Sequence, residues 1–269
     1  MTRFLVVPQW QGSPAARAML LVDGAEAIAG DLPRASCTVV DVPVEAGESL
    51  DTGIRRLSAL QRVSERMREA LAASDEVALV VGGDCGVAVP AISHAATHHD
   101  DLAVVWFDAH ADHHSPETSA SGAFAGMALG SVWRDTSLAP AAVAPERVVL
   151  AGAREFDPAE RETLDSSPVT ELTVDALADV AAVADAVERT GASAVYIHVD
   201  LDVLDPAVIS GVSLPLPFGL TLEQLTGAIR ELRRRVPLAG SSIAGFAPPT
   251  PAAAVDDLGA ILRVIGALA

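Results

Sequence analysis

Three residues that can bind a metal ion lie two positions apart in one short segment of the sequence. Asp108, His110 and Asp112 follow residues 104–107, whose β-branched and aromatic side chains are typical of a strand buried on both faces. Because alternate residues of an extended chain point the same way, the two carboxylates and the imidazole can be aimed at one point. The segment therefore predicts a metal site rather than a polar loop.

Two further apolar runs end in residues of the same kind. Residues 77–81 precede Cys85, and residues 194–199 precede Asp200 and Asp202. In open parallel sheets, ligands bind at the carboxyl ends of the strands, so we expect these side chains to converge there. Two divalent ions would suit this donor set, and they would acidify a bridging water to give hydroxide near neutral pH. The six candidate ligands are Cys85, Asp108, His110, Asp112, Asp200 and Asp202.

The composition limits both the partners and the chemistry. The chain has 269 residues, half of them hydrophobic, and a net charge of −18, which disfavours nucleic acid and anionic membranes and is compatible with a cationic substrate. It contains no lysine, which excludes Schiff-base chemistry and a phosphate-binding lysine loop. The N-terminus lacks the pattern of a signal peptide, and no apolar run reaches the ~20 residues of a membrane span, so we expect a cytoplasmic protein.

Strand and helix patterns alternate along the whole chain. This alternation implies a parallel sheet with right-handed crossovers and helices on both faces, and no linker divides residues 1–269, so we expect one domain. The expected strands are residues 4–7, 37–42, 77–81, 104–107, 147–150, 169–172, 194–199 and 241–246. The expected helices are residues 14–29, 54–73, 87–98, 124–133, 174–190, 221–235 and 252–269, with a short helix near residue 158.

Three motifs in the chain resemble those of the ureohydrolases, the family of arginase, agmatinase and formiminoglutamase. Residues 82–85 (GGDC) resemble G-G-D-H, residues 108–112 (DAHAD) match D-A-H-x-D, and residues 200–206 (DLDVLDP) match D-x-D-x-x-D-P. Their order and spacing agree over essentially the full chain. The resemblance implies a three-layer α/β/α arginase-like fold with an eight-stranded parallel sheet. It also implies two divalent metal ions, most often manganese, that hydrolyse a guanidinium or amidine, in a homo-oligomer such as a trimer or hexamer.

The resemblance also implies a role for each residue of the site. It implies that Asp108 and Asp200 bridge the ions, Cys85 and Asp112 bind one ion, and His110 and Asp202 bind the other. Asp108, His110 and Asp200 are the residues expected to be catalytic. His114 and Ser121 fall where family members contact the substrate carboxylate, and Asp157 falls where an acidic residue holds the α-amino group.

Three positions depart from the family pattern. Cys85 stands where the histidine of G-G-D-H is usual, and a thiolate is a softer ligand. Ala125 replaces the proton-shuttling histidine, whose loss costs ~10²–10⁴ in rate unless His113 or His114 takes its place. The guanidinium-binding glutamate at the end of the last strand falls on Gly245 or Phe246.

Three hypotheses follow from these residues. The leading one is a metal-dependent amidinohydrolase that attacks a guanidino or amidine compound, such as arginine or N-hydroxy-arginine, with a metal-bound hydroxide. The second is a non-catalytic or strongly impaired ureohydrolase homologue with a binding or regulatory role, because of Ala125 and the missing glutamate. The third is a deacetylase of the same fold with one zinc ion, which a measured stoichiometry near one ion per chain would favour.

Overall fold

The computed structural model describes residues 2–269, and eight strands in it form one sheet. The strands are β1 Arg3–Val7, β2 Cys37–Val39, β3 Ala78–Gly82, β4 Leu102–Phe107, β5 Val148–Ala151, β6 Thr170–Leu172, β7 Ala194–Asp200 and β8 Leu238–Ala244. They lie in the order β2-β1-β3-β8-β7-β4-β5-β6, and each neighbouring pair is parallel. The parallel sheet that the sequence predicts is thus confirmed.

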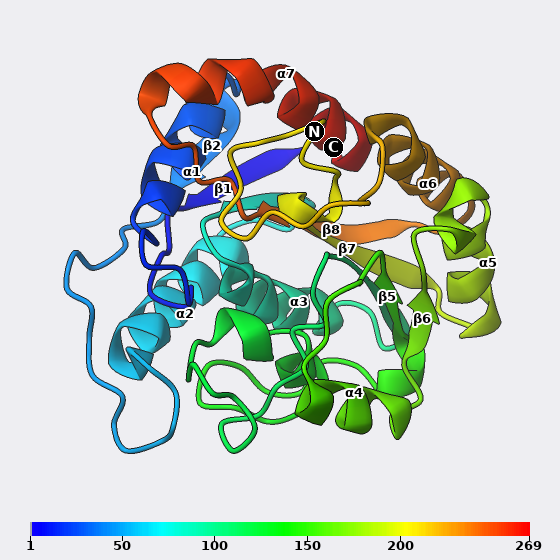
Figure 1. Ribbon diagram of the computed structural model, residues 1–269, viewed down its shortest axis with the longest axis horizontal. Coiled ribbons are helices and arrows are strands. Elements are labelled where there is room, and N and C mark those ends of the chain that lie inside the picture. Colours follow the sequence, from blue (N-terminus) through cyan, green and yellow to red (C-terminus); the bar gives the residue numbers. More distant parts are fainter. Residues whose placement is uncertain (1) are drawn as a thin grey trace.

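Helices cover both faces of this sheet (Figure 1). One face packs against α1 Leu20–Gly30, α5 Ala182–Arg189, α6 Leu222–Arg235 and α7 Pro251–Leu268. The other face packs against α2 Leu57–Ala72, α3 Ala88–Ala96 and α4 Pro158–Asp165. The result is the three-layer α/β/α arrangement expected for this pattern of alternating elements.

The central strands β4 and β7 are buried along their whole length. Val105 and Phe107 face the layer of α5 and α6, whereas Val104 and Trp106 face the layer of α2 and α3. Burying such a side chain completely stabilises the fold by ~1.5–3 kcal/mol, so both faces hold the register of β4 firmly. This fixed register determines where Asp108, the next residue of the chain, is placed.

Several predicted helices are shorter or broken in the structure. The helix expected over residues 14–29 begins at Leu20, because the residues before it form tight turns, with bonds from Ala18 N to the Ala15 carbonyl (3.2 Å) and from Leu20 N to the Arg17 carbonyl (3.0 Å). Residues 124–133 form two 3₁₀ helices, η3 Ala125–Met127 and η4 Gly130–Trp133, instead of one α-helix. The helix expected over 174–190 is interrupted at Asp179, which is extended.

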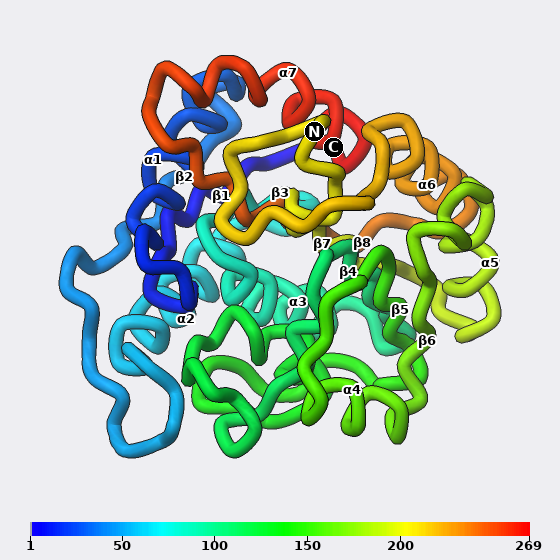
Figure 2. Tube along the Cα trace, viewed as in Figure 1, coloured from blue at the N-terminus to red at the C-terminus, as the bar shows by residue number. Residues whose placement is uncertain are grey.

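The strands that matter for the site are neighbours, although they are distant in the sequence. Strand β4 follows β3 along the chain, but β8 and β7 lie between them in the sheet. The strands β3, β8, β7 and β4 are therefore contiguous. The segment between β7 and α6 crosses in front of these strands (yellow in Figure 2). Within residues 2–269, no helix is both long and apolar enough to cross a membrane.

Candidate metal centre

Asp108, His110 and Asp202 form a first group of candidate ligands at the carboxyl edge of the sheet. The Nδ1 atom of His110 lies 3.1 Å from Oδ2 of Asp202 and 3.4 Å from Oδ1 of Asp108. One ligand atom from each of the three residues lies within 4.8 Å of the other two. The backbone N–H of Ala109 donates to Oδ1 of Asp202 (3.1 Å), which joins the end of β4 to the end of β7. The three side chains could therefore share one ion.

Cys85 is a further candidate ligand at the same edge of the sheet. It begins the 3₁₀ turn η2 Cys85–Val87 after β3, and its thiol donates to Oδ2 of Asp200 (2.7 Å) and lies 4.0 Å from Oδ2 of Asp108. The preceding Asp84 is buried and accepts hydrogen bonds from the Gln9 amide (2.9 Å) and from the backbone of Gly12 (2.9 Å). Asp84 thus positions the turn that presents the thiol.

All six predicted metal ligands line a single cavity of about 200 Å³. His114 and Ser121, which were predicted to bind substrate, line it as well, together with Ala125 and Gly245. Asp157 is not among the lining residues. Its Oδ2 atom lies 2.9 Å from Nε2 of His114, and its Oδ1 atom caps the N-terminus of α4. Its contribution to substrate binding therefore stays a prediction, and the structure shows it as the partner of His114.

Asp112 is held in a conformation that needs a compensating interaction. Its φ is +50°, in the left-handed region, which costs an L-residue ~1–2 kcal/mol. Its Oδ2 atom is buried and has no hydrogen-bond partner within residues 2–269. Such strain is typical of a functional site, and a bound cation would satisfy the unpaired oxygen.

Burial of so many acidic groups alters their protonation. Burial raises the pKa of Asp200 to about 7 and that of Asp202 to about 6, and the neighbouring carboxylates add to both shifts. Burial and nearby carboxylates also raise the pKa of the Cys85 thiol and of Asp112. Burial alone would lower the pKa of His110, but its hydrogen bonds to carboxylates outweigh this and raise it to about 12. Oxygen, nitrogen and sulfur donors around this much negative charge fit divalent cations.

Two residues of the site escaped the sequence analysis. His198 lies inside β7, is fully buried, and forms a group with Cys85 and Asp108 whose ligand atoms lie within 4.8 Å of one another. The available signal was its position two residues before Asp200, which places both on one face of the strand. Glu160 is also buried and lines the cavity, but a glutamate in the first turn of a helix looks in the sequence like an ordinary capping residue.

The structure shows what stands at the positions that depart from the family pattern. Ala125 lines the cavity beside Gly126. Gly245 also lines it, with φ +87°, and a Cβ atom at this position would collide with the carboxylate of Asp200. Phe246 is completely buried in the core. Neither position of β8's end thus offers a carboxylate to a guanidinium, and Gly245 makes room for Asp200.

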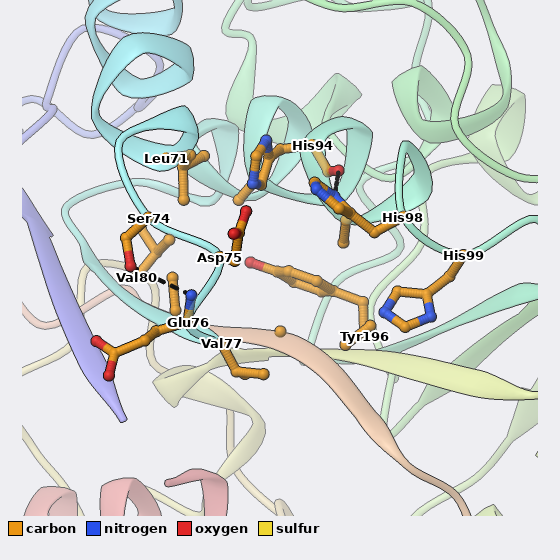
Figure 3. A pocket seen from close by; sticks show the side chains of 15 residues that line it. Leu71, Ser74, Asp75, Glu76, Val77, Val80, His94, His98, His99 and Tyr196 are labelled. Atoms are coloured by element: carbon orange, nitrogen blue, oxygen red, sulfur yellow. Dashed lines mark hydrogen bonds between the residues drawn. The ribbon is translucent and has the colours of Figure 1, made fainter. Parts of the chain in front are cut away.

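A second cavity, of about 110 Å³, lies at the opposite, amino-terminal edge of the sheet (Figure 3). His94, His98 and Asp75 surround it, and the hydroxyl of Tyr196 points among them (Figure 3). The groups of three candidate metal ligands found in residues 2–269 both lie at the carboxyl edge instead. Among the described residues, the groups of candidate metal ligands therefore lie at or beside the first cavity.

Comparison with known proteins agrees with this geometry. The family model described as the arginase family matches residues 17–261. The chain belongs to the arginase family. The arginase of Bacillus caldovelox is 32% identical over 206 residues, which cover 68% of this chain and 68% of the relative. The resemblance based on the three motifs is thereby confirmed.

Solved structures of arginases share the fold. The arginase of Entamoeba histolytica in complex with L-ornithine superposes with a TM-score of 0.87 at 21% identity, covering 99% of this chain and 97% of the other. The native Bacillus caldovelox arginase gives a TM-score of 0.80 at 24% identity, covering 98% of both chains. The arginase-like sheet and its flanking helices are thus confirmed.

Proposed function

We propose that this member of the arginase family is an amidinohydrolase that uses two divalent ions to hydrolyse a guanidino compound. The observation that carries the proposal is the convergence of six candidate metal ligands, four of them carboxylates, on one acidic cavity. A pair of bound ions would supply an acidified water and would polarise the carbon of the guanidino group. The resemblance of the motifs favours manganese, whereas the thiol of Cys85 favours a softer ion.

The chain itself holds the ligand carboxylates in fixed orientations. Asp108 accepts hydrogen bonds from the Trp106 indole (3.0 Å) and from the backbone N–H of His110 (2.8 Å). Asp200 accepts from the backbone N–H of Asp202 (2.9 Å) and from the thiol of Cys85. Such outer contacts pre-orient ligands, so little reorganisation is needed when cations bind.

The cavity also suits a cationic substrate. Glu160 accepts a hydrogen bond from the backbone N–H of His113 (2.9 Å), and its carboxylate lines the cavity. Burial raises the pKa of Glu160, so a nearby guanidinium would favour its ionised form. We infer that Glu160 contributes the negative charge that the end of β8 lacks, with arginine and N-hydroxy-arginine as the candidate substrates.

His114 is better placed than His113 to move a proton in place of Ala125, although its Nδ1 atom also contacts the Thr118 hydroxyl (3.2 Å). It lines the cavity, and its Nε2 atom is oriented by Asp157. His113 is unsuited, because burial lowers its pKa to about 4 and its Nε2 atom faces the Arg134 guanidinium at 3.4 Å. A histidine oriented by a carboxylate is a common general acid–base group.

The test is turnover by protein of known metal content. Purified protein loaded with manganese, cobalt or zinc is mixed with arginine, N-hydroxy-arginine and shorter and longer guanidino compounds, and released urea or hydroxyurea is measured. The proposal predicts release from at least one compound and loss of release in Asp108→Asn. Metal-loaded protein that releases neither product from any compound would overturn it.

A second candidate function is ligand binding without catalysis. Ala125 and the carboxylate-free end of β8 favour it, because both remove groups that a guanidino hydrolase normally uses. This alternative predicts that calorimetry detects binding of a guanidino compound to the metal-loaded protein while no urea appears. Turnover that Asp108→Asn abolishes would exclude it.

A further inference from the structure

His198 is a buried histidine with one unused nitrogen. Its side chain is fully buried inside β7, and its ring packs on Trp106 with the ring centroids 3.8 Å apart. Its Nδ1 atom lies 2.8 Å from Oγ of Ser242 on the neighbouring strand β8. Its Nε2 atom is buried and has no hydrogen-bond partner among residues 2–269. Leaving such a polar atom unpaired is unfavourable, so an interaction that satisfies it would stabilise the protein.

His198 belongs to a cluster of three residues that could hold a metal ion. One ligand atom each from Cys85, Asp108 and His198 lie within 4.8 Å of one another, and all three residues are buried. Because Nδ1 is engaged with Ser242, Nε2 is the nitrogen left for a ligand. His198 and Asp200 alternate along β7 and share a face, so the imidazole approaches the centre from the interior of the sheet.

We propose that His198 is a metal ligand, whose Nε2 atom binds the same ion as the Cys85 sulfur and the Asp108 carboxylate. This inference rests on the metal centre of the proposed function. In this arrangement, β7 supplies the imidazole that residue 85 does not provide. The inner ion is then held from the core of the protein, while the outer ion is held by His110 from the loop after β4.

The contacts around His198 are compatible with the form that can bind a cation. If Nδ1 carries the proton and donates it to Oγ of Ser242, the lone pair of Nε2 is free. A histidine that binds a metal commonly donates its other N–H to a neighbouring oxygen, and this bond fixes the ring. Trp106 adds to the restraint, because its ring packs on His198 while its indole N–H holds Asp108 at 3.0 Å. One tryptophan therefore orients two of the three ligands.

The donor set of the inner ion differs from that of the outer ion. A thiolate, an imidazole and a carboxylate together favour zinc or cobalt over manganese. The outer group offers two carboxylates and one imidazole, which suit manganese as well. The inference therefore predicts two unequal sites in one centre, the inner one selective for the softer ion.

The experiment compares metal binding by three variants under anaerobic, reducing conditions. His198→Phe removes the ligand and retains an aromatic ring against Trp106, and Ser242→Ala removes only the orienting hydrogen bond. His113→Phe is the matched control, because His113 is also buried and lies against a tryptophan, Trp133, with ring centroids 5.1 Å apart. Equilibrium dialysis with zinc and cobalt gives stoichiometry and affinity. The thiolate-to-cobalt absorption band reports the ion bound by Cys85.

The expected result is a stepwise loss confined to the inner ion. His198→Phe should weaken that ion's binding by at least ~100-fold and remove the thiolate-to-cobalt band, Ser242→Ala should weaken it by ~10-fold, and His113→Phe should leave it unchanged. X-ray absorption of the zinc-loaded wild type provides a check that needs no variant. It should show two imidazoles for each pair of ions.

Three outcomes would overturn the inference. If the wild type binds two ions and His198→Phe binds them equally well, His198 is not a ligand, while the proposed function stands. If the zinc-loaded wild type shows only one imidazole for two ions, the same conclusion holds even where His198→Phe fails to fold. If the wild type binds no divalent ion, both the inference and the proposed function fail.

Discussion

The two ligand groups of the centre differ in what surrounds them. In the outer group, His110 sits in the loop after β4, with 21% of its side chain exposed, and it contacts Glu155 at 3.4 Å as well as its fellow ligands. In the inner group, Cys85, Asp108 and His198 are all buried, and their surroundings are strands and core side chains. The outer group keeps the residue types of the family motif, whereas the inner group combines a thiol with a histidine from another strand.

This difference teaches where a metal site can change its ligands. The proposed ligand His198 on β7 can lie close to the turn after β3 because β3, β8, β7 and β4 are contiguous in the sheet. Ser242 and Trp106, from β8 and β4, hold the ring of His198 in place. The order of strands in the sheet, rather than spacing along the chain, determines which side chains can reach the centre.

The largest expected effect comes from the ligand that both groups share. Asp108→Asn removes a charge from both ligand sets, so we expect both ions to be lost and urea release to fall by at least ~10³-fold. Metal analysis after dialysis, combined with the turnover assay, checks this. Asp75→Asn at the amino-terminal edge is the control and should retain both ions. Retention of both ions by Asp108→Asn would show that the two groups are independent.

Cys85→Ser should weaken zinc binding at the inner group much more than manganese binding at the outer group. Serine retains the size of the side chain but replaces the soft sulfur by a hard, neutral oxygen, so zinc affinity at the inner site should fall by ~100-fold or more. Manganese binding at the outer group should change by less than ~3-fold. Competition between zinc and manganese, measured by dialysis, gives both values. Equal losses for the two metals would mean that the thiol is not a ligand.

Asp200 should make the stability of the metal-free protein depend on pH. Burial raises its pKa from 3.8 to about 7, so the folded state holds a proton that the unfolded state releases near pH 4. The stabilising effect of that proton is complete below about pH 4 and is lost as the pH rises to about 7. Relative to Asp200→Asn, the metal-free wild type should therefore lose up to ~4 kcal/mol of unfolding free energy over this range.

Urea denaturation at several pH values measures this difference. Saturating zinc provides the control, because a bound cation favours the ionised carboxylate and should abolish the loss in the wild type. A difference between wild type and Asp200→Asn that stays constant from pH 4 to 7 would contradict the account.

The smallest expected effect concerns substrate recognition. If Glu160 faces the guanidinium, Glu160→Gln should raise KM by ~10-fold and change kcat by less than ~3-fold, because the charge acts equally in the ground and transition states. Steady-state kinetics on the substrate found in the turnover screen checks this. Glu162→Gln is the matched control, since Glu162 lies on the same helix α4 but is exposed. An unchanged KM in Glu160→Gln would place recognition elsewhere in the cavity.

Much of the fold was predictable because it depends on local pattern. The apolar run before Asp108 forms the expected buried strand β4, and the helix expected from residue 221 begins with a capping box of Thr221 and Gln224. The prediction of one α-helix over residues 124–133 was wrong. Bonds to distant segments, such as the one from Ala125 N to the Gly12 carbonyl, accompany two 3₁₀ helices there instead. Such bonds connect distant segments and leave no periodic trace in the sequence.

The site was predictable where its residues belong to one segment. Asp108, His110 and Asp112 could be assigned from their spacing, and Asp200 and Asp202 likewise. His198 belongs to the same segment as Asp200, but that spacing alone does not distinguish a ligand from a core histidine, and its contacts with Cys85 and Ser242 depend on neighbouring strands. Gly245 is similar: only the structure shows that its missing side chain makes room for Asp200.

Anomalous diffraction from crystals of the zinc-loaded protein tests the central claim most directly. The account predicts two zinc peaks in the cavity at the carboxyl edge of the sheet. One should be coordinated by His110 and Asp202, the other by Cys85 and His198, and Asp108 should contact both. A single peak at His110, or no peak in this cavity in fully reduced protein, would contradict the account.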